Sequence, residues 1–210
     1  MAVKTTLLEP VAANGTVVLG ASGDTISIPS GVTLANSGTA TGFGGGTNTP
    51  AFEAYLGVSG GQAVSDSTTT TVAIETEVFD VGSCYNNTGS TVTLNGISVP
   101  AYTFLPNVSG KYFVYAGILT DTGTNSNIDS ADIFLNKENG NIISQTLNNF
   151  LSNPVRQAFV QIQSTLVMNG TSNSVTLRGR ITSSNGSGQL FEAYPQWRRA
   201  TYFGAYKIIE

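Results

Sequence analysis

A group of side chains near the C-terminus is of the types that bind ligands. Tyr194, Trp197, Arg198 and Arg199 lie within six consecutive residues, and Trp197 is the only tryptophan in the chain. Aromatic rings can stack on a sugar ring, arginine donates hydrogen bonds to hydroxyl or acidic groups, and both types dominate protein contacts. We therefore expect a ligand-binding site here. The alternative is that Trp197 seals the interior of the fold or the contact between subunits.

Catalytic chemistry has little support in the sequence. The chain has no histidine, so no Ser-His-Asp, Cys-His or Cys/His zinc site can form. Cys84 is the only cysteine, and without a basic residue near it in sequence we expect a small buried apolar side chain. No spacing of carboxylates singles out a pair for glycoside hydrolysis. The sequence predicts a protein that is not an enzyme and carries no cofactor.

Three acidic residues raise the question of a metal. Asp121, Asp129 and Asp132 could supply oxygen ligands to calcium. No spacing of the calcium-hand type is present, and solvated loop acids are the simpler interpretation. We expect no metal site, although the sequence leaves calcium binding open.

Composition excludes several partners. Of the 210 residues, 40% are apolar and 10% charged, and the net charge is −4, which is typical of a folded chain without the positive stripe that nucleic acids need. The N-terminal apolar run is broken at Glu9 and Pro10, and no later run reaches membrane-spanning length. We expect a protein made in a cytoplasm that binds neither nucleic acid nor the membrane interior.

Short alternating runs of β-branched and aromatic residues predict an all-β chain. Asn-Gly pairs, as at Asn95-Gly96 and Asn139-Gly140, supply the turns between them. Within Ile142–Gln157 a short helix is conceivable, but Pro154 and the asparagines favour strand, loop, strand. The candidate strands are Thr71–Phe79, Thr91–Val99, Tyr112–Leu119, Ala131–Leu135, Ala158–Met168, Ser174–Ile181 and Arg199–Ile209.

A glycine-rich stretch, Gly42–Thr49, indicates a boundary. It separates an N-terminal anchoring segment and β stalk, residues 1–46, from a head domain, residues 47–210. In the stalk, apolar side chains at even spacings share one face; they are Ile26, Ile28, Val32 and Leu34. Such a narrow stripe cannot offset the entropy of ordering one chain, so we expect it to form the core of a trimeric stalk. A flexible linker is the alternative.

The head contains the pattern YTFLPNVSGKYFVYA, in which Phe104 precedes Gly110 by six positions and Tyr112 follows. This resembles the signature strand of the complement-globular-head and tumour-necrosis-factor jelly roll. AFEAYLG, from Ala51, resembles that family's first strand, and ATYFGAYKIIE its last. The resemblance implies a jelly-roll β-sandwich, a homotrimer, and a core that includes Phe104, Gly110, Tyr112, Phe203 and Tyr206. An insertion around Asn86–Pro100 departs from the family pattern, as does the turn Gly170–Asn173.

The stretch GASGDTISIPSGVTLANSGTATGFG resembles a short module of bacteriophage structural proteins, notably marine ones. Together with the head it implies a virion structural protein on the outside of the phage particle. We expect a fibre-like tail appendage that binds other virion proteins through its N-terminal segment and a host-surface glycan or protein through its head. The alternative is a capsid decoration or head-fibre protein. At about 3.3 Å per residue a stalk over Asn14–Ala40 would extend less than ~100 Å, which excludes a long fibre built from this chain alone.

Overall fold

The computed structural model describes residues 21–27, 29–33, 47–123, 125–186, 189–193 and 199–209. The chain divides into two units, Met1–Gly44 and Gly45–Glu210. A division at residues 46 and 47, as proposed from the glycine-rich stretch, stays a prediction.

The described part of the first unit contains turns and no strand. Its turns are closed by hydrogen bonds from Asp24 N to Ala21 O and from Val32 N to Pro29 O. A β strand needs neighbouring backbone for its hydrogen bonds, and among the described residues no strand pairing involves 21–33. Ile26 and Val32 are 63% and 58% exposed. Ile28 and Leu34 lie outside the described residues, and the trimeric stalk stays a prediction.

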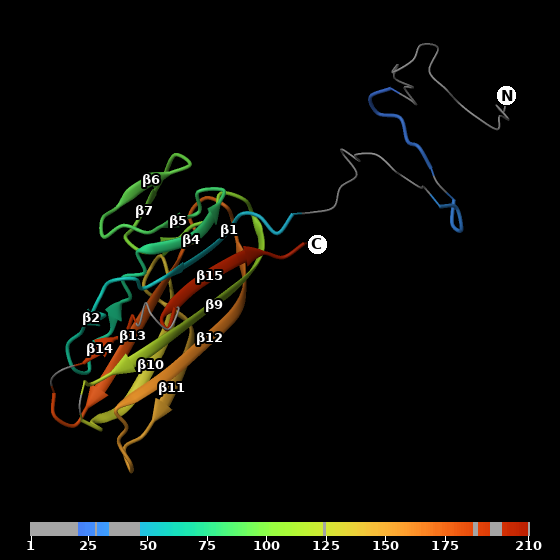
Figure 1. Ribbon diagram of the computed structural model, residues 1–210. Helices are drawn as coiled ribbons and strands as arrows, with labels where there is room; N and C mark the ends of the chain where they lie inside the picture. Colours follow the sequence, from blue (N-terminus) through green and yellow to red (C-terminus); the bar gives the residue numbers. More distant parts are fainter. Residues whose placement is uncertain are drawn as a thin grey trace, which may run out of the picture. The chain divides into compact units, whose positions relative to one another are not determined.

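The second unit is a sandwich of two antiparallel sheets (Figure 1). The front sheet has the strand order β4-β1-β15-β9-β12, and two short strands, β14 and β2, continue it beside the end of β9. The strands of this sheet are β1 (Ala51–Tyr55), β2 (Gln62–Ala63), β4 (Thr76–Val81), β9 (Gly110–Asp121), β12 (Gln157–Met168), β14 (Leu190–Phe191) and β15 (Tyr202–Lys207).

The back sheet has the order β11-β10-β13-β8-β5, and β3 also pairs with β13. The strands of this sheet are β3 (Thr70–Thr71), β5 (Tyr85–Asn86), β8 (Thr103–Phe104), β10 (Ile128–Lys137), β11 (Ile142–Asn149) and β13 (Val175–Ser183). A separate hairpin consists of β6 (Val92–Leu94) and β7 (Ile97–Val99). No helix occurs among the described residues that could cross a membrane.

The path of the chain between the sheets defines a jelly roll. From β9 in the front sheet it crosses to β10 and β11 in the back sheet, returns in β12, crosses again to β13 and ends in β15 at the front. Antiparallel strands that alternate between two sheets in this way form the double-sheet jelly roll. The predicted all-β class and jelly-roll head are confirmed. Strand, loop, strand over 142–157 is also what the structure shows.

Aromatic side chains fill the space between the sheets. Phe104, Tyr112 and Phe203 have no exposed surface. Phe52 stacks on Tyr85 with ring centres 4.3 Å apart, and it also lies 5.1 Å from Phe104 and 5.0 Å from Phe203. The core therefore joins β1, β5, β8 and β15 through one group of rings.

Tyr206 does not belong to this core, contrary to the expectation from sequence. Its side chain is 38% exposed. Successive residues of a strand point to opposite faces, so Phe203 and Tyr206, three positions apart on β15, cannot both point inward.

Two predicted strands are also divided: Thr71–Phe79 contains a gap between β3 and β4, and Thr91–Val99 turns back at Asn95-Gly96 to form the β6–β7 hairpin.

Gly110 opens β9 with a backbone conformation that disfavours side chains. Its φ of 149° lies in the region that L residues rarely adopt. Two residues later the Tyr112 ring enters the core, and its hydroxyl donates a hydrogen bond to Val108 O at 2.7 Å. The glycine thus allows the chain to enter the central strand of the front sheet.

Candidate functional site

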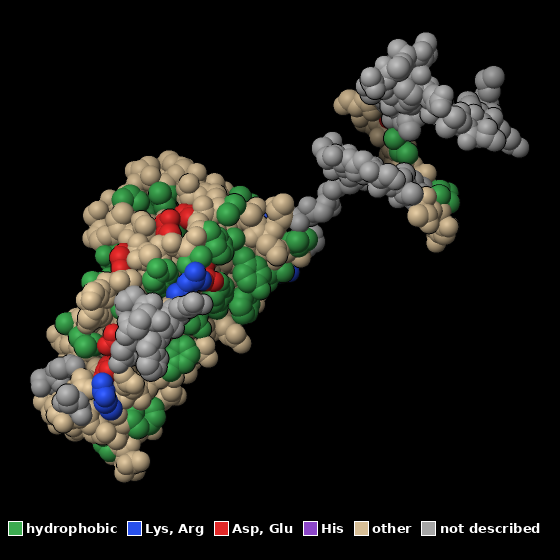
Figure 2. All heavy atoms as spheres, in the orientation of Figure 1, with side chains coloured by type: hydrophobic (Ala, Val, Ile, Leu, Met, Phe, Trp, Pro, Cys, Tyr) green, Lys and Arg blue, Asp and Glu red, His purple; other side chains and the backbone are tan. Residues whose placement is uncertain are grey.

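The outer surface of the front sheet carries a group of exposed or half-buried rings, here called the aromatic face. Its members come from the three neighbouring strands β15, β9 and β12, and they are Phe113, Tyr115, Phe159, Tyr202 and Tyr206. Adjacent ring centres are 5.5 to 6.4 Å apart. Figure 2 shows hydrophobic side chains gathered over these strands. Because inward and outward positions alternate, the same strands supply both the core and this face.

Two glycines keep the rings close to the sheet. Tyr115 is paired across the strands with Gly204, and Tyr202 with Gly117. A Cβ atom at Gly117 would lie 2.8 Å from the rings of Phe159 and Tyr202, and one at Gly204 would collide with the Tyr115 ring. The rings therefore cover backbone that has no side chains of its own, an arrangement known to support glycines in sheets. The face is not flat, since a depression of about 330 Å³ lies between Tyr115 and Tyr202, lined also by Gln161 and Gln163.

A polar group lies beside these rings. Glu53 on β1 accepts a hydrogen bond from the Tyr115 hydroxyl at 2.9 Å and forms an ion pair with Arg199 at 2.6 Å. The Arg199 guanidinium also lies 5.6 Å from the centre of the Tyr55 ring. Burial raises the pKa of Tyr115, and the hydrogen bond and charge of Glu53 raise it further. The neutral phenol is therefore the form that donates to Glu53.

Arg199 is the one member of the predicted ligand-binding group whose position the structure describes. Tyr194, Trp197 and Arg198 lie outside the described residues, so their arrangement stays a prediction. Sequence reasoning did not single out the aromatic face. The signal was present in YFVYA and TYFGAYK, where aromatic residues occupy both alternating sets of positions and so cannot all point inward.

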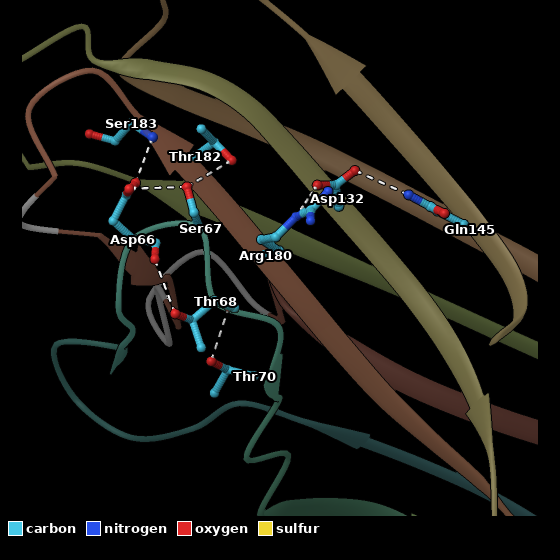
Figure 3. A network of polar contacts seen from close by, with 9 residues as sticks. All are labelled: Asp66, Ser67, Thr68, Thr70, Asp132, Gln145, Arg180, Thr182 and Ser183. Atoms are coloured by element: carbon cyan, nitrogen blue, oxygen red, sulfur yellow. Dashed lines mark hydrogen bonds and ion pairs between the residues drawn. The ribbon is translucent and has the colours of Figure 1, made fainter. Parts of the chain in front are cut away.

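The back sheet carries a group of paired polar side chains. Asp132 has no exposed surface and accepts hydrogen bonds from Arg180 at 2.8 Å and from Gln145 at 3.4 Å. The Arg180 guanidinium lies 5.8 Å from the centre of the Phe134 ring. Figure 3 shows this group together with Asp66, which accepts hydrogen bonds from Ser67 and Ser183 nearby.

The residues considered for calcium do not gather at one place. Asp132 forms an ion pair with Arg180. Asp121 forms an ion pair with Arg156 at 3.5 Å and accepts a hydrogen bond from Gln157 at 2.6 Å. Within the described ranges no three acidic, cysteine or histidine side chains come together in a way that could hold a metal ion. The carboxylates of Asp121 and Asp132 thus bind groups of the chain itself.

Cys84 is enclosed by the head. Its thiol has no exposed surface and donates to Asp80 Oδ1 at 3.2 Å. Burial, followed by the charge of Asp80, raises the pKa of this thiol. Since the thiolate is the reactive form, burial and the raised pKa both lower the reactivity expected of Cys84 in the folded protein.

Comparisons with known proteins identify structures of similar fold. The sequence matches no family model and no curated protein. Eiger TNF from S. frugiperda has a TM-score of 0.48 and 14% identity, over 76% of this chain and 92% of that one. Murine APRIL at pH 5.0 has a TM-score of 0.47 and 12% identity, over 75% and 98%. The likeness is one of fold.

Proposed function

We propose that this protein is a non-enzymatic structural component of a bacteriophage particle. In this proposal it is a homotrimer, a fibre-like tail appendage whose head contacts the host surface. The aromatic face supports the assembly in this proposal, because it gathers partly exposed rings from three neighbouring strands on one side of the head.

The composition of the aromatic face is that of a protein interface. Tyrosine and phenylalanine are enriched in the buried centres of interfaces, and polar groups surround them. Phe159 and Tyr206 are 45% and 38% exposed, and the Glu53–Arg199 pair with Tyr115 supplies polar groups beside the rings. The rings of Tyr115 and Tyr202 fill the space above Gly204 and Gly117, so they are held in place on the sheet and are available to a neighbouring subunit. The resemblance of the sequence to trimeric jelly-roll heads favours three copies around one axis.

The N-terminal unit supports a role in attachment to a particle. Ile26 and Val32 are exposed, and other virion proteins or the same segment of neighbouring subunits could cover them. The resemblance of this stretch to phage modules points to a virion. A capsid decoration or head-fibre protein is the second candidate, favoured by the short length predicted for the stalk.

The oligomeric state of the full chain tests the proposal directly. Light scattering at micromolar concentration should give three times the 21.8 kDa mass of one chain. Phe159→Lys, on the aromatic face, should yield folded monomers. Leu147→Lys is the matched control, since Leu147 is also exposed but lies on β11 of the other sheet, and it should stay trimeric. A monomeric wild-type protein, or a trimeric Phe159→Lys variant, would reject the aromatic face as the interface.

Location and host contact need separate measurements. A labelled antibody on intact particles should bind the tail; binding over the capsid would replace the first candidate by the second. If Tyr194, Trp197 and Arg198 act with Arg199 on a host glycan or protein, Trp197→Ala with Arg198→Ala should abolish adsorption of the isolated protein to host cells while the trimer remains. Unchanged adsorption would exclude this group.

A further inference from the structure

Two arginines project from β13 on the side of the head opposite the aromatic face. Leu177 and Ile181 on the same strand are buried between the sheets, and successive residues of a strand point to opposite faces. Arg178 and Arg180 therefore lie on the outer surface of the back sheet, where Asp132 on β10 is paired with Arg180. Two guanidinium charges against one carboxylate leave this group with an excess of one positive charge.

Arg180 is held in place through its Nε atom. This atom donates to Asp132 Oδ2 at 2.8 Å (Figure 3), and the guanidinium lies 5.8 Å from the centre of the Phe134 ring. Asp132 has no exposed side-chain surface, whereas the side chain of Arg180 is 37% exposed. Within the described residues Nη1 and Nη2 of Arg180 make no hydrogen bond, and neither atom is buried. Both are available to a group from solution.

Arg178 adds a second cation two positions away on the same side of β13. Its Nη2 atom donates to Thr69 O at 2.9 Å, and its Nε atom is buried. Nη1 is the nitrogen of Arg178 that is left for a ligand. Because contacts within the chain hold both guanidinium groups in advance, the site loses less side-chain entropy when a ligand binds.

The free nitrogens of Arg180 suit an oxyanion. Nη1 and Nη2 lie in one plane and can donate two parallel hydrogen bonds, a geometry that carboxylate and phosphate groups accept. Asp132 does not compete for them, since its two oxygens are bound by Arg180 Nε and by Gln145. A neutral hydroxyl would make no use of the positive charge, and a nucleic acid needs a longer basic stripe than two arginines provide.

We propose that Arg178 and Arg180 form a binding site for one oxyanion, a carboxylate or phosphate group. Arg180 binds it through Nη1 and Nη2, and Arg178 adds a third donor and a second charge. The anion comes either free in solution or as a substituent of a larger acidic ligand. The site is complete within one chain and lies on the other sheet from the aromatic face, so it goes beyond the proposed assembly and does not depend on it.

Ligand-observed NMR on the full chain tests this assignment, with inorganic phosphate and methyl glucuronide as probes and methyl glucoside as the neutral control. At least one of the two anions should bind with millimolar affinity, which should fall as salt is added. Methyl glucoside should not bind. Arg178→Gln keeps a donor for Thr69 O but removes the charge, and it should weaken binding at least about tenfold.

The matched control is Arg156→Gln. Arg156 carries the same charge, but its half-exposed side chain pairs with Asp121 outside this group, so the variant should bind both anions as wild type does. A loss as large as that in Arg178→Gln would show attraction to the net charge of the protein and would overturn the site.

Arg180 needs a double variant, because removing it alone leaves the buried Asp132 carboxylate without a cation. Asp132→Leu with Arg180→Met removes the site together with the buried charge, so the head should stay folded and binding of both anions should be lost. Binding equal to wild type in this variant or in Arg178→Gln, or no binding of either anion to wild type, would overturn the site. If the double variant does not fold, Arg178→Gln still decides.

The measurements separate this proposal from the one on assembly. The Phe159→Lys variant should bind the small anions as wild type does whether or not light scattering finds a trimer. Polygalacturonate distinguishes the two sources of the anion. A larger acidic ligand reaches several sites at once, so it should bind a confirmed trimer more tightly than the Phe159→Lys monomer. Equal affinity would identify a free anion as the ligand.

Discussion

Tyr115 on β9 lies opposite Gly204 on β15, and its ring occupies the space that a side chain at Gly204 would need. The reverse pairing, Tyr202 opposite Gly117, occurs two residues away on the same two strands. In each pair a ring takes the place of a missing side chain on the neighbouring strand. The positions of the Tyr115 and Tyr202 rings therefore depend on both members of each pair.

Gly204→Ala should displace the Tyr115 ring and destabilise the head by about 1–3 kcal/mol, the usual cost of overpacking. Urea unfolding measures the loss. In a Tyr115→Ala background the added methyl group has room, so the same substitution should cost less there. Equal costs in the two backgrounds would show that the ring contact is not the reason for glycine at this position.

Tyr112 and Tyr206 should respond differently to truncation because one is enclosed and the other exposed. Tyr112→Ala leaves a cavity beside Phe104 and should cost about 3–5 kcal/mol. Tyr206→Ala should change the stability of the single chain by less than about 1 kcal/mol while lowering the fraction of trimer. The first effect is measured by thermal unfolding and the second by light scattering. A large loss of single-chain stability in Tyr206→Ala would place that ring in the core after all.

Removing one partner of the Asp132–Arg180 pair should be costly. Arg180→Met leaves a carboxylate with no exposed surface and no cation, for which about 3–5 kcal/mol is typical. Replacing both residues, by Asp132→Leu with Arg180→Met, removes the buried charge and should recover most of this loss. Urea unfolding of the single and double variants decides the matter, and a double variant as unstable as the single one would contradict the explanation.

The buried tyrosines predict loss of stability in alkali. Burial raises the pKa of Tyr112 to about 12, against about 10 in an unfolded chain. The unfolded chain therefore releases this proton first, and the stability due to the neutral phenol is complete below about pH 10 and is lost as the pH rises through about 12. Unfolding by urea between these values should show the fall. Tyr112→Phe should reduce its slope, and an unchanged slope would assign the effect to other groups.

The strands of the head were predictable because their signals are local. Asn95 and Gly96 specify a turn by their own conformations, at φ of 50° and 79°, and alternation marks β9 and β12 directly. The inward or outward direction of a ring is different. It is decided by the sheet that packs on the strand, so Tyr206 was assigned to the core although its position relative to Phe203 puts it on the opposite face.

The candidate sites were predictable only in part, because residues distant in sequence form them. The aromatic face brings β9, β12 and β15 together through cross-strand registers that no single segment encodes. The Glu53–Arg199 ion pair likewise joins residues far apart in the sequence.

The enclosure of Cys84 makes the protein convenient for spectroscopic labelling. It is the only cysteine in the chain, and its thiol is buried with a raised pKa, so maleimide reagents will not modify it while the head is folded. A cysteine introduced at exposed Ser98 on the β6–β7 hairpin would therefore take up a spin label or fluorophore at one site per chain, without removal of the native thiol. Distances between such labels in the assembled protein would all be equal if the subunits are related by a three-fold axis.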